Sequence, residues 1–428
     1  MSKLLIKSGR VIDPSIQRDE VSDLYVENGK IVEYFQNESG ETHEIDARGM
    51  WVVPGLIDLH VHFRDPGQTH KEDIESGLRS AVAGGFTTVC TMPNTSPTTD
   101  SPELIKYQID KAEKLGLAKL LPTSAITKGL NGTELVDPDK NIKAGAAAFT
   151  DDGKSVMNLE LVEKFFADAG KLGVPVFVHC EDLNLVKAGQ VCYKAAKRLK
   201  LAPICNESES TIVKRDIDLA IKHGTKLHIC HVSTKQSAVA IANARKTHPH
   251  LITAEVSPHH LMLTEKDIKR PDANFKMCPP LRTKKDQKAM IKAVQDGVIT
   301  VIATDHAPHS VEEKSQAFEK APNGIVGLET AVGVVLTKLY HSSKRRPCPV
   351  KIIAALTSNP AKILGVDAGT LQVGKPADIT IIDPERFFTV DAKTFKSKSQ
   401  NTPFHGRGLQ GKVIYTIVSG EVRFQVTG

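Results

Sequence analysis

Side chains that could bind a metal ion alternate with apolar side chains in residues 55–65. The polar members are Asp58, His60, His62 and Arg64, and the apolar members are Ile57, Leu59, Val61 and Phe63. Successive side chains of a β-strand point to opposite faces, so the pattern predicts a buried strand with both histidines on one face, about 7 Å apart. Two such imidazoles can bind one metal ion. The alternative is a pair of hydrogen-bonded core histidines, which a single His-x-His pattern does not exclude.

The strand that carries these histidines is the first of eight predicted strands, and helical stretches lie between most of them. The other strand candidates are residues 86–90, 119–125, 146–149, 174–178, 226–230, 251–256 and 298–303. Helical patterns cover residues 102–115, 159–172, 208–223, 236–246 and 286–294. This order predicts an α/β fold, a (β/α)₈ TIM-type barrel over residues 54–365.

Both ends of the chain are rich in predicted strands instead. At the beginning, strands are expected over residues 4–12 and 42–47, and a hairpin over 23–32 turns at Asn28-Gly29. The far end repeats this arrangement, with a strand over residues 377–383 and a hairpin over 412–425. We therefore expect residues 1–53 and 366–428 to form one small β-sandwich domain beside the barrel.

In a barrel of this kind, the chemistry takes place at the carboxyl ends of the strands. The metal-ligand candidates at those ends are His60, His62, Asp152, His179, His231 and Asp305. Agreement between several strand ends favours a metal centre over core packing. Imidazoles and carboxylates suit zinc, with manganese or iron as alternatives, and this many ligands predicts two ions about 3.5–4 Å apart. Cys180 and Cys230 directly neighbour two of these histidines, so strand alternation predicts that their thiols face the helices.

Length and composition are those of an ordinary globular protein. The 428 residues suit one large barrel with a small accessory domain, and the net charge of +6 is mild and spread along the chain. Without a long basic run or a membrane-length apolar run, neither nucleic acid nor a membrane is an expected partner. Seven cysteines without Cys-x-x-Cys spacing, and a start without a signal-peptide pattern, predict a reduced cytoplasmic protein.

Longer motifs carry a family resemblance along nearly the whole chain. They are Gly55-Leu56-Ile57-Asp58-Leu59-His60-Val61-His62, His62-Phe63-Arg64-Asp65-Pro66-Gly67, Met92-Pro93-Asn94-Thr95, Phe149-Thr150-Asp151-Asp152-Gly153, His231-Val232-Ser233-Thr234-Lys235, Pro279-Pro280-Leu281-Arg282, Ala303-Thr304-Asp305-His306-Ala307-Pro308-His309 and Asn401-Thr402-Pro403-Phe404. Together they resemble the long, type I bacterial dihydroorotases of the amidohydrolase superfamily. The resemblance implies reversible conversion of N-carbamoyl-L-aspartate to L-dihydroorotate in de novo pyrimidine (UMP) biosynthesis.

The resemblance implies roles for the metal-ligand candidates. His60 and His62 match the first ligand pair, and His179 and His231 match the ligands of a second zinc ion. Asp152 matches a bridging carboxylate, where many relatives in the superfamily have a carboxylated lysine. Asp305 matches an aspartate that both binds metal and moves protons. The alternative is that Asp305 is only a ligand and a loop histidine is the acid.

The resemblance also implies a substrate pocket. Arg64 and Asn94 match groups that hold the substrate α-carboxylate, and the alternative is a salt bridge from Arg64 to Asp65 or to another acidic neighbour at the rim. The other residues implied at the substrate are His62, Cys278, His309, Pro322, Asn323 and Gly324. Cys278 stands where the family usually has an asparagine that contacts the substrate.

Other functions remain as alternatives. Dihydropyrimidinases, hydantoinases and allantoinases share the barrel and open similar rings, but they need no carboxylate clamp. Some dihydroorotase-like chains are non-catalytic partners of aspartate transcarbamoylase, and those chains have lost metal ligands. Because every ligand candidate is present here, catalysis is the better interpretation. The resemblance further suggests a homodimer and a complex with aspartate transcarbamoylase.

Overall fold

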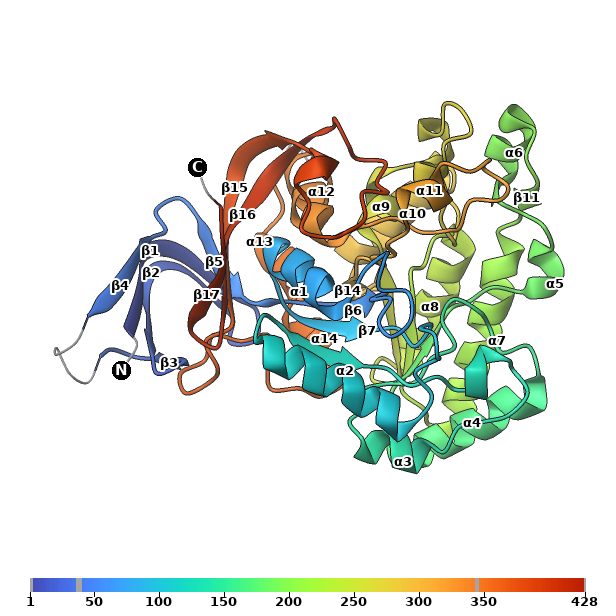
Figure 1. Ribbon diagram of the computed structural model, residues 1–428, viewed down its shortest axis with the longest axis horizontal. Coiled ribbons are helices and arrows are strands. Elements are labelled where there is room, and N and C mark those ends of the chain that lie inside the picture. The colour runs from blue at the N-terminus through green and yellow to red at the C-terminus, as the bar shows by residue number, and fades with distance from the viewer. Residues whose placement is uncertain (1–2, 36–40, 343–345, 427–428) are drawn as a thin grey trace.

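A barrel of parallel strands surrounded by helices lies beside a sheet built from both ends of the chain (Figure 1). The computed structural model describes residues 3–35, 41–342 and 346–426. In Figure 1 the blue strands of the N-terminal part and the red strands of the C-terminal part lie side by side, and the barrel occupies the other half of the molecule. The predicted α/β class, with a barrel and a small β domain built from both termini, is confirmed, and the strands of that domain, predicted as a β-sandwich, pair in one eight-stranded sheet.

The barrel strands pair in two parallel runs. The first run is β6 (Leu56–Val61), β7 (Phe86–Thr91) and β8 (Lys119–Pro122), and the second is β9 (Val176–Val178), β12 (Leu227–Ile229), β13 (Ile252–Val256) and β14 (Val301–Ile302). All residues of β6 are buried, as expected for a strand covered on both faces. A parallel bridge between Val61 and His306 connects the last run back to β6 and closes the barrel.

The predicted fourth strand, residues 146–149, is shorter than expected. Only Phe149 forms bridges, to Ser124 on one side and Val176 on the other. Its amide donates to Pro175 O (3.2 Å), and its carbonyl accepts from Phe177 N (2.8 Å). The position of the fourth strand is therefore filled, but by too few paired residues to form a regular strand.

Helices follow most of the barrel strands. They are α1 (Ile74–Ala83), α2 (Pro102–Leu115), α3 (Pro138–Lys143), α4 (Leu159–Leu172), α7 (Glu207–His223), α8 (Lys235–Thr247), α10 (Lys284–Gln295), α13 (Pro349–Ala354) and α14 (Ser358–Leu364). The bounds of α2 and α4 match the prediction because the stop signals are local. Each ends at a glycine in the left-handed region, Gly116 (φ 57°) and Gly173 (φ 69°).

Short elements build the rim of the barrel. They are α5 (Leu183–Val186), β10 (Val191–Cys192), α6 (Tyr193–Leu199), β11 (Pro203–Ile204), α9 (Pro258–Met262), α11 (Val311–Lys314) and α12 (Ala331–Val335), which continues as a π-helical segment (Leu336–His341). Among the described residues, no helix combines the length and apolar character that crossing a membrane requires.

The terminal sheet contains eight strands. They are β1 (Lys3–Asp13), β2 (Arg18–Glu27), β3 (Lys30–Val32), β4 (Thr42–Asp46), β5 (Trp51–Pro54), β15 (Ile379–Thr389), β16 (Gly408–Val418) and β17 (Glu421–Gln425). Their order is β17-β16-β15-β5-β1-β2-β3, and β4 pairs with β1. Both predicted hairpins form, since Asn28-Gly29 and Ser419-Gly420 adopt the positive φ values that two-residue turns require.

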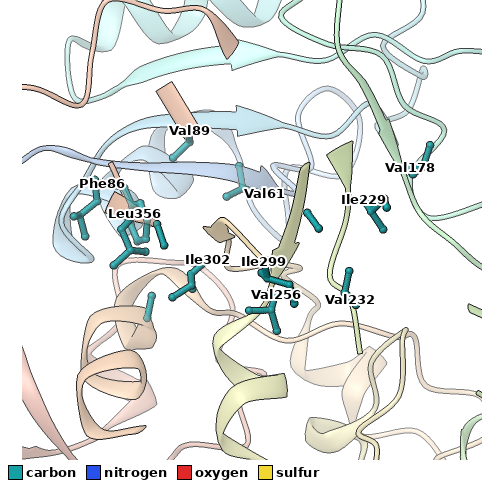
Figure 2. Close-up of a cluster of buried hydrophobic side chains, with 14 of the residues drawn as sticks. Val61, Phe86, Val89, Val178, Ile229, Val232, Val256, Ile299, Ile302 and Leu356 are labelled. Carbon is teal, nitrogen blue, oxygen red and sulfur yellow. The ribbon is translucent and has the colours of Figure 1, made fainter. Parts of the chain in front are cut away.

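One large apolar cluster fills the barrel and reaches the terminal sheet through residues such as Trp51 and Ile382. In the barrel, Val61, Val178, Ile229 and Val256 belong to this cluster, and Figure 2 shows Val178, Ile229 and Val256 on the neighbouring strands β9, β12 and β13. A second cluster, which includes Ile6 of β1 and Ile379 of β15, lies within the terminal sheet domain. The exact boundaries of the two domains stay a prediction.

One C-terminal segment packs against the rim of the barrel. Val390 and Phe404 share an apolar cluster with Phe318 and Ile325. Nearby, Asn401 Nδ2 donates hydrogen bonds to two rim carbonyls, Ala307 O and Gly324 O, both at 3.0 Å. Residues between β15 and β16 therefore help to fix the loops around the site.

Candidate metal centre

The carboxylate of Asp152 lies between two groups of metal-ligand candidates. Asp152 Oδ2 is 3.4 Å from His60 Nε2 and 3.4 Å from His62 Nε2. Its other oxygen, Oδ1, is 3.3 Å from His179 Nδ1 and 3.4 Å from His231 Nε2. All of these side chains are buried. Each oxygen of this carboxylate therefore faces a different pair of histidines.

Asp305 completes the first group. Its Oδ1 atom is 3.2 Å from His62 Nε2 and 3.7 Å from His60 Nε2. Asp305 adopts φ 51°, a conformation that non-glycine residues rarely hold. Side chains from the ends of different strands, far apart in the sequence, thus lie close together in one small buried volume.

The tautomers of His60 and His62 direct lone pairs into this volume. His60 Nδ1 lies 2.8 Å from Glu255 Oε1, and His62 Nδ1 lies 2.8 Å from Asn94 Oδ1. Both partners are acceptors, so each Nδ1 carries the proton and each Nε2 presents its lone pair to carboxylate oxygens. Acceptors that face each other need a cation between them.

Two atoms of the cluster lack a hydrogen-bond partner within the described part of the chain, which supports a donor set that fits a metal ion. His60 Nε2 and Asp152 Oδ1 are buried polar atoms without a hydrogen-bond partner among the described residues. Buried polar groups are almost always satisfied, so such orphaned atoms call for a ligand. The groups His60, Asp152 and His231, and His60, His62 and Asp305, each place their ligand atoms within 4.8 Å of one another.

The charges of the site also favour a cation. Burial lowers the pKa of His60, but the carboxylates of Asp152 and Glu255 outweigh it and raise the pKa well above its usual value, so the site favours a positive charge at Nε2, either a proton or a metal ion. Burial raises the pKa of Asp305, but the nearby imidazoles of His62, His60 and His231 outweigh it and lower the pKa to about 2. The carboxylates are therefore ionised at neutral pH.

A cavity of about 310 Å³ opens beside this cluster. Arg64 lines it, and its side chain is buried, with Nε 3.3 Å from Pro308 O and Nη2 3.4 Å from His309 Nε2. No ion pair in the described part of the chain involves Arg64, and Asp65 pairs with Lys111 instead (2.6 Å). The alternative salt bridge between Arg64 and Asp65 is therefore wrong.

Comparison with known proteins identifies the family. Residues 51–423 match the amidohydrolase family. A dihydroorotase of Aquifex aeolicus (strain VF5) is 46% identical over 99% of this chain and 100% of its own length. A dihydroorotase of Clostridioides difficile (strain 630) is 45% identical over 98% of this chain and 99% of its own length. The chain belongs to the dihydroorotases of the amidohydrolase family.

A solved structure supports the same fold for this family member. The L-hydantoinase (dihydropyrimidinase) from Arthrobacter aurescens superimposes with a TM-score of 0.87 at 26% identity, covering 100% of this chain and 98% of that chain. Amidohydrolases depend on metal ions, in agreement with the histidine and aspartate cluster.

The remaining residues that dihydroorotase resemblance implied also lie at the cavity. Its lining includes His62, Asn94, Cys278, His309, Asn323 and Gly324, but not His60 or Pro322. Lys314 Nζ donates to Pro322 O (3.0 Å) and Gly324 O (2.8 Å), which fixes this loop. Gly324 has φ 131°, and a Cβ there would lie 2.6 Å from Ala307 Cβ, so only glycine fits.

Sequence reasoning missed several residues of this dihydroorotase site. Leu130, Lys154 and Glu181 line the cavity, and nothing in their local sequence signals this. Glu255, which orients His60, also accepts from His228 Nε2 at 2.9 Å. The sequence could have indicated Glu255, because it is a charged residue within the apolar strand β13 and a buried charge needs a partner.

The expectation for the two cysteines is correct at one position and wrong at the other. Cys180 Sγ lies 4.0 Å from Asp216 Oδ2 on α7, on the helix side. Cys230, however, belongs to a group with His60 and Glu255 inside the barrel. Strand β12 ends at Ile229, and His231 adopts φ 32°, so the alternation of faces breaks between Cys230 and His231.

We predict that Glu255→Gln weakens metal binding while the protein stays folded. The amide removes the charge that holds the His60 tautomer, and loss of such an outer partner costs about 10–100-fold in metal affinity. Competition with a chelator measures this affinity. Glu75→Gln, at an exposed pair with Arg79, is the matched control and should bind metal normally. Unchanged affinity in Glu255→Gln would contradict the role given to Glu255.

Proposed function

We propose that the chain interconverts N-carbamoyl-L-aspartate and L-dihydroorotate in de novo pyrimidine (UMP) biosynthesis. The observation that carries this proposal is the buried guanidinium of Arg64, which lacks a carboxylate partner in the described part of the chain and lies at the edge of the histidine and aspartate cluster. An unpaired buried charge is costly, and a carboxylate of the substrate would pair with it. Both compounds of this reaction carry such a carboxylate.

The ligand set supports two zinc ions per chain. The first would bind His60, His62, Asp305 and Asp152 Oδ2, and the second would bind His179, His231 and Asp152 Oδ1. Nitrogen and oxygen donors of this kind suit zinc, although another divalent metal is an alternative. When bound, the ions supply a Lewis acid for the amide carbonyl and a water molecule whose pKa is lowered toward neutrality.

Asp305 is the residue that we assign to proton transfer. In the hydrolytic direction, water adds to the ring amide carbonyl, and the bond from this carbon to the ring nitrogen breaks. Asp305 accepts the proton from water and passes it to the leaving nitrogen, which its low pKa permits because the carboxylate is ionised. In synthesis, the ureido nitrogen attacks the side-chain carboxyl carbon, and water leaves.

Arg64, Asn94 and His309 surround the position that we assign to the substrate α-carboxylate. The Arg64 guanidinium offers two parallel donors, a geometry that fits a carboxylate. Burial lowers the pKa of Arg64 to about 10, so it stays charged at neutral pH. The loop of Asn323 and Gly324 lines the same cavity, and we assign its backbone to contacts with the substrate ring.

Arg64 also separates this reaction from the alternatives. Dihydrouracil and hydantoin lack a carboxylate, so a dihydropyrimidinase or hydantoinase would leave this guanidinium unpaired. A non-catalytic role as a partner of aspartate transcarbamoylase is disfavoured because the complete ligand set is assembled in one buried cluster. A homodimer, a complex with aspartate transcarbamoylase and a cytoplasmic location stay predictions from the family resemblance.

We predict close to two divalent ions per chain after reconstitution with zinc alone. Asp152 supplies the bridging carboxylate, so bicarbonate, which forms a carboxylated lysine, is not needed. Elemental analysis measures the metal content. Protein without metal would contradict the enzyme assignment, and strict dependence on bicarbonate would contradict the role of Asp152.

Asp305→Asn should retain metal but lose turnover in both directions, because an amide cannot accept the proton from water. General acid–base groups contribute roughly 10²–10⁴-fold to rate, so we expect a loss of at least about 100-fold. Assays of ring opening and ring closure, with metal content measured alongside, test this. Full activity with two ions bound would show that another residue carries the proton.

Arg64→Met should lower kcat/KM for dihydroorotate by at least about tenfold. Hydrogen bonds to a charged group contribute about 1.5–3 kcal/mol, and 1.4 kcal/mol corresponds to one decade in kcat/KM. The zinc-loaded protein should be offered dihydroorotate, dihydrouracil, hydantoin and allantoin. Wild-type protein should prefer dihydroorotate, and any turnover of dihydrouracil should barely change in the variant.

The exposed Arg79 on α1 provides the matched control, and Arg79→Met should behave as wild type. If Arg64→Met lost activity equally on dihydroorotate and dihydrouracil, with metal content also reduced, Arg64 would be holding the site together. The specificity argument would then be wrong.

A further inference from the structure

A buried lysine at the end of α11 contacts the loop that lines the substrate cavity. The side chain of Lys314 is buried, and its Nζ atom donates to three backbone carbonyls, those of Lys276 (3.4 Å), Pro322 (3.0 Å) and Gly324 (2.8 Å). An ammonium group carries three donors and no acceptor, so these carbonyls satisfy it completely. Two of them belong to the loop that places Asn323 and Gly324 at the cavity, whereas Lys314 is not part of the cavity lining. The ammonium therefore contacts this loop from the interior of the protein.

This contact gives a direction to the peptide between Pro322 and Asn323. The peptide bond is trans, and the C=O and N–H groups of a trans peptide point in opposite directions. The C=O of Pro322 points inward to Lys314 Nζ, so the N–H of Asn323 points away from the ammonium. Asn323 lines the cavity, and no hydrogen bond within the described residues uses its N–H. This amide is therefore a donor that is available to a ligand.

The other polar backbone groups of this segment already have partners. Asn323 O accepts from His309 Nε2 (2.8 Å), and Gly324 N donates to Lys276 O (3.0 Å). The two remaining carbonyls accept from Lys314, and the proline of the segment has no N–H. Backbone polar groups that lie away from water are almost always paired, so the one group left over is informative. The single free donor of the segment is the amide whose direction Lys314 sets.

We propose that Lys314 is a positioning residue for substrate binding: its ammonium turns the peptide between Pro322 and Asn323 so that Asn323 N–H points into the cavity and donates to a ring carbonyl of the substrate. Without the ammonium, this peptide is free to rotate and to present the Pro322 carbonyl, which repels a ring carbonyl. The identity of the substrate rests on the proposed function, whereas the orientation of the peptide does not.

The protonation state of Lys314 sets the number of donors that hold the peptide. Burial and the charge of Lys276 lower the pKa of Lys314 to about 7, although Asp272 and Glu313 attract its charge. The imidazole of His309 is the other titratable group that this charge affects. Below pH 7 the ammonium has three donors for three carbonyls. As the pH rises above 7 it loses a proton, only two donors remain, and the hold on the peptide weakens.

The test compares the kinetics of zinc-loaded Lys314→Met and wild-type protein. Methionine has a similar length but donates no hydrogen bond. We expect the KM for dihydroorotate below pH 7 to rise roughly three- to tenfold, the effect of one lost hydrogen bond. The kcat should barely change, because the metal ligands are untouched. Above pH 7 the ratio of the two KM values should fall, since the wild-type protein then loses its own ammonium. An unchanged KM below pH 7, or a ratio that grows with pH, would overturn the proposal.

Two other lysines provide matched controls. Lys276 is also buried, but its Nζ atom donates to Phe318 O (2.6 Å) and Ala321 O (2.6 Å) of the same loop, away from the peptide in question. Lys276→Met should therefore raise KM less than Lys314→Met, and an equal increase would overturn the specific role of Lys314. Lys320 is exposed on this loop, and Lys320→Met should behave as wild type.

The fold of each variant needs its own measurement. Circular dichroism and an unchanged metal content establish that Lys314→Met is folded. Lys314→Gln keeps two N–H donors and provides a second variant, whose KM should lie between those of wild-type protein and Lys314→Met. A KM for Lys314→Gln above that of Lys314→Met would contradict the role of the donors.

Hydrogen exchange separates this proposal from the assigned reaction. The amide of Gly324, next to the peptide in question, is protected by its hydrogen bond to Lys276 O. Its exchange should be faster in Lys314→Met and unchanged in Lys320→Met, because loss of the ammonium loosens the loop locally. This result without any turnover of dihydroorotate by wild-type protein would remove the assigned reaction but leave the orientation of the peptide standing. Normal turnover with unchanged KM and unchanged exchange in Lys314→Met would remove the role of Lys314 alone.

Discussion

The carboxylate of Asp152, buried between four imidazoles, is the interaction on which the site depends. Each of its oxygens faces a separate histidine pair. A buried carboxylate is stable only with charge or hydrogen-bond partners, and here the partners are imidazole nitrogens that also require a cation. These side chains lie close together because the carboxyl ends of the parallel barrel strands meet at one rim.

A ring of further buried acids holds these ligands in place. Glu255 fixes His60, and Asp58 accepts from the amides of His60 (3.0 Å) and Thr304 (3.1 Å). Glu209 accepts from the amides of Ser233 and Thr234, just after His231. Each contact ties a ligand-bearing strand end to another element. Because a buried charge without a partner is costly, these acids keep their hydrogen bonds and hold the ligand side chains in place.

On the cavity side of the site, in contrast, a buried charge has no carboxylate partner among the described residues. Arg64 is buried, no carboxylate of the described chain forms an ion pair with it, and its Nε lies 3.3 Å from Pro308 O. The loop that carries Asn323 and Gly324 is held by Lys314 and by Asn401 from the C-terminal segment. The terminal part of the chain therefore shapes the cavity as well as forming the sheet, and this links the two parts of the molecule to one function.

The sequence by itself determined what local patterns encode: the alternation around His60, the ends of α2 and α4 at glycines, and the Asn28-Gly29 hairpin. It also placed the ligand candidates at one rim, because the barrel rule needs only strand ends. Only the tertiary structure decided contacts between distant residues, such as His60 with Glu255 and Cys278 with Glu181. It also turned Cys230 inward, because the φ of 32° at His231 breaks the alternation, and backbone strain of this kind depends on surrounding packing that no local pattern records.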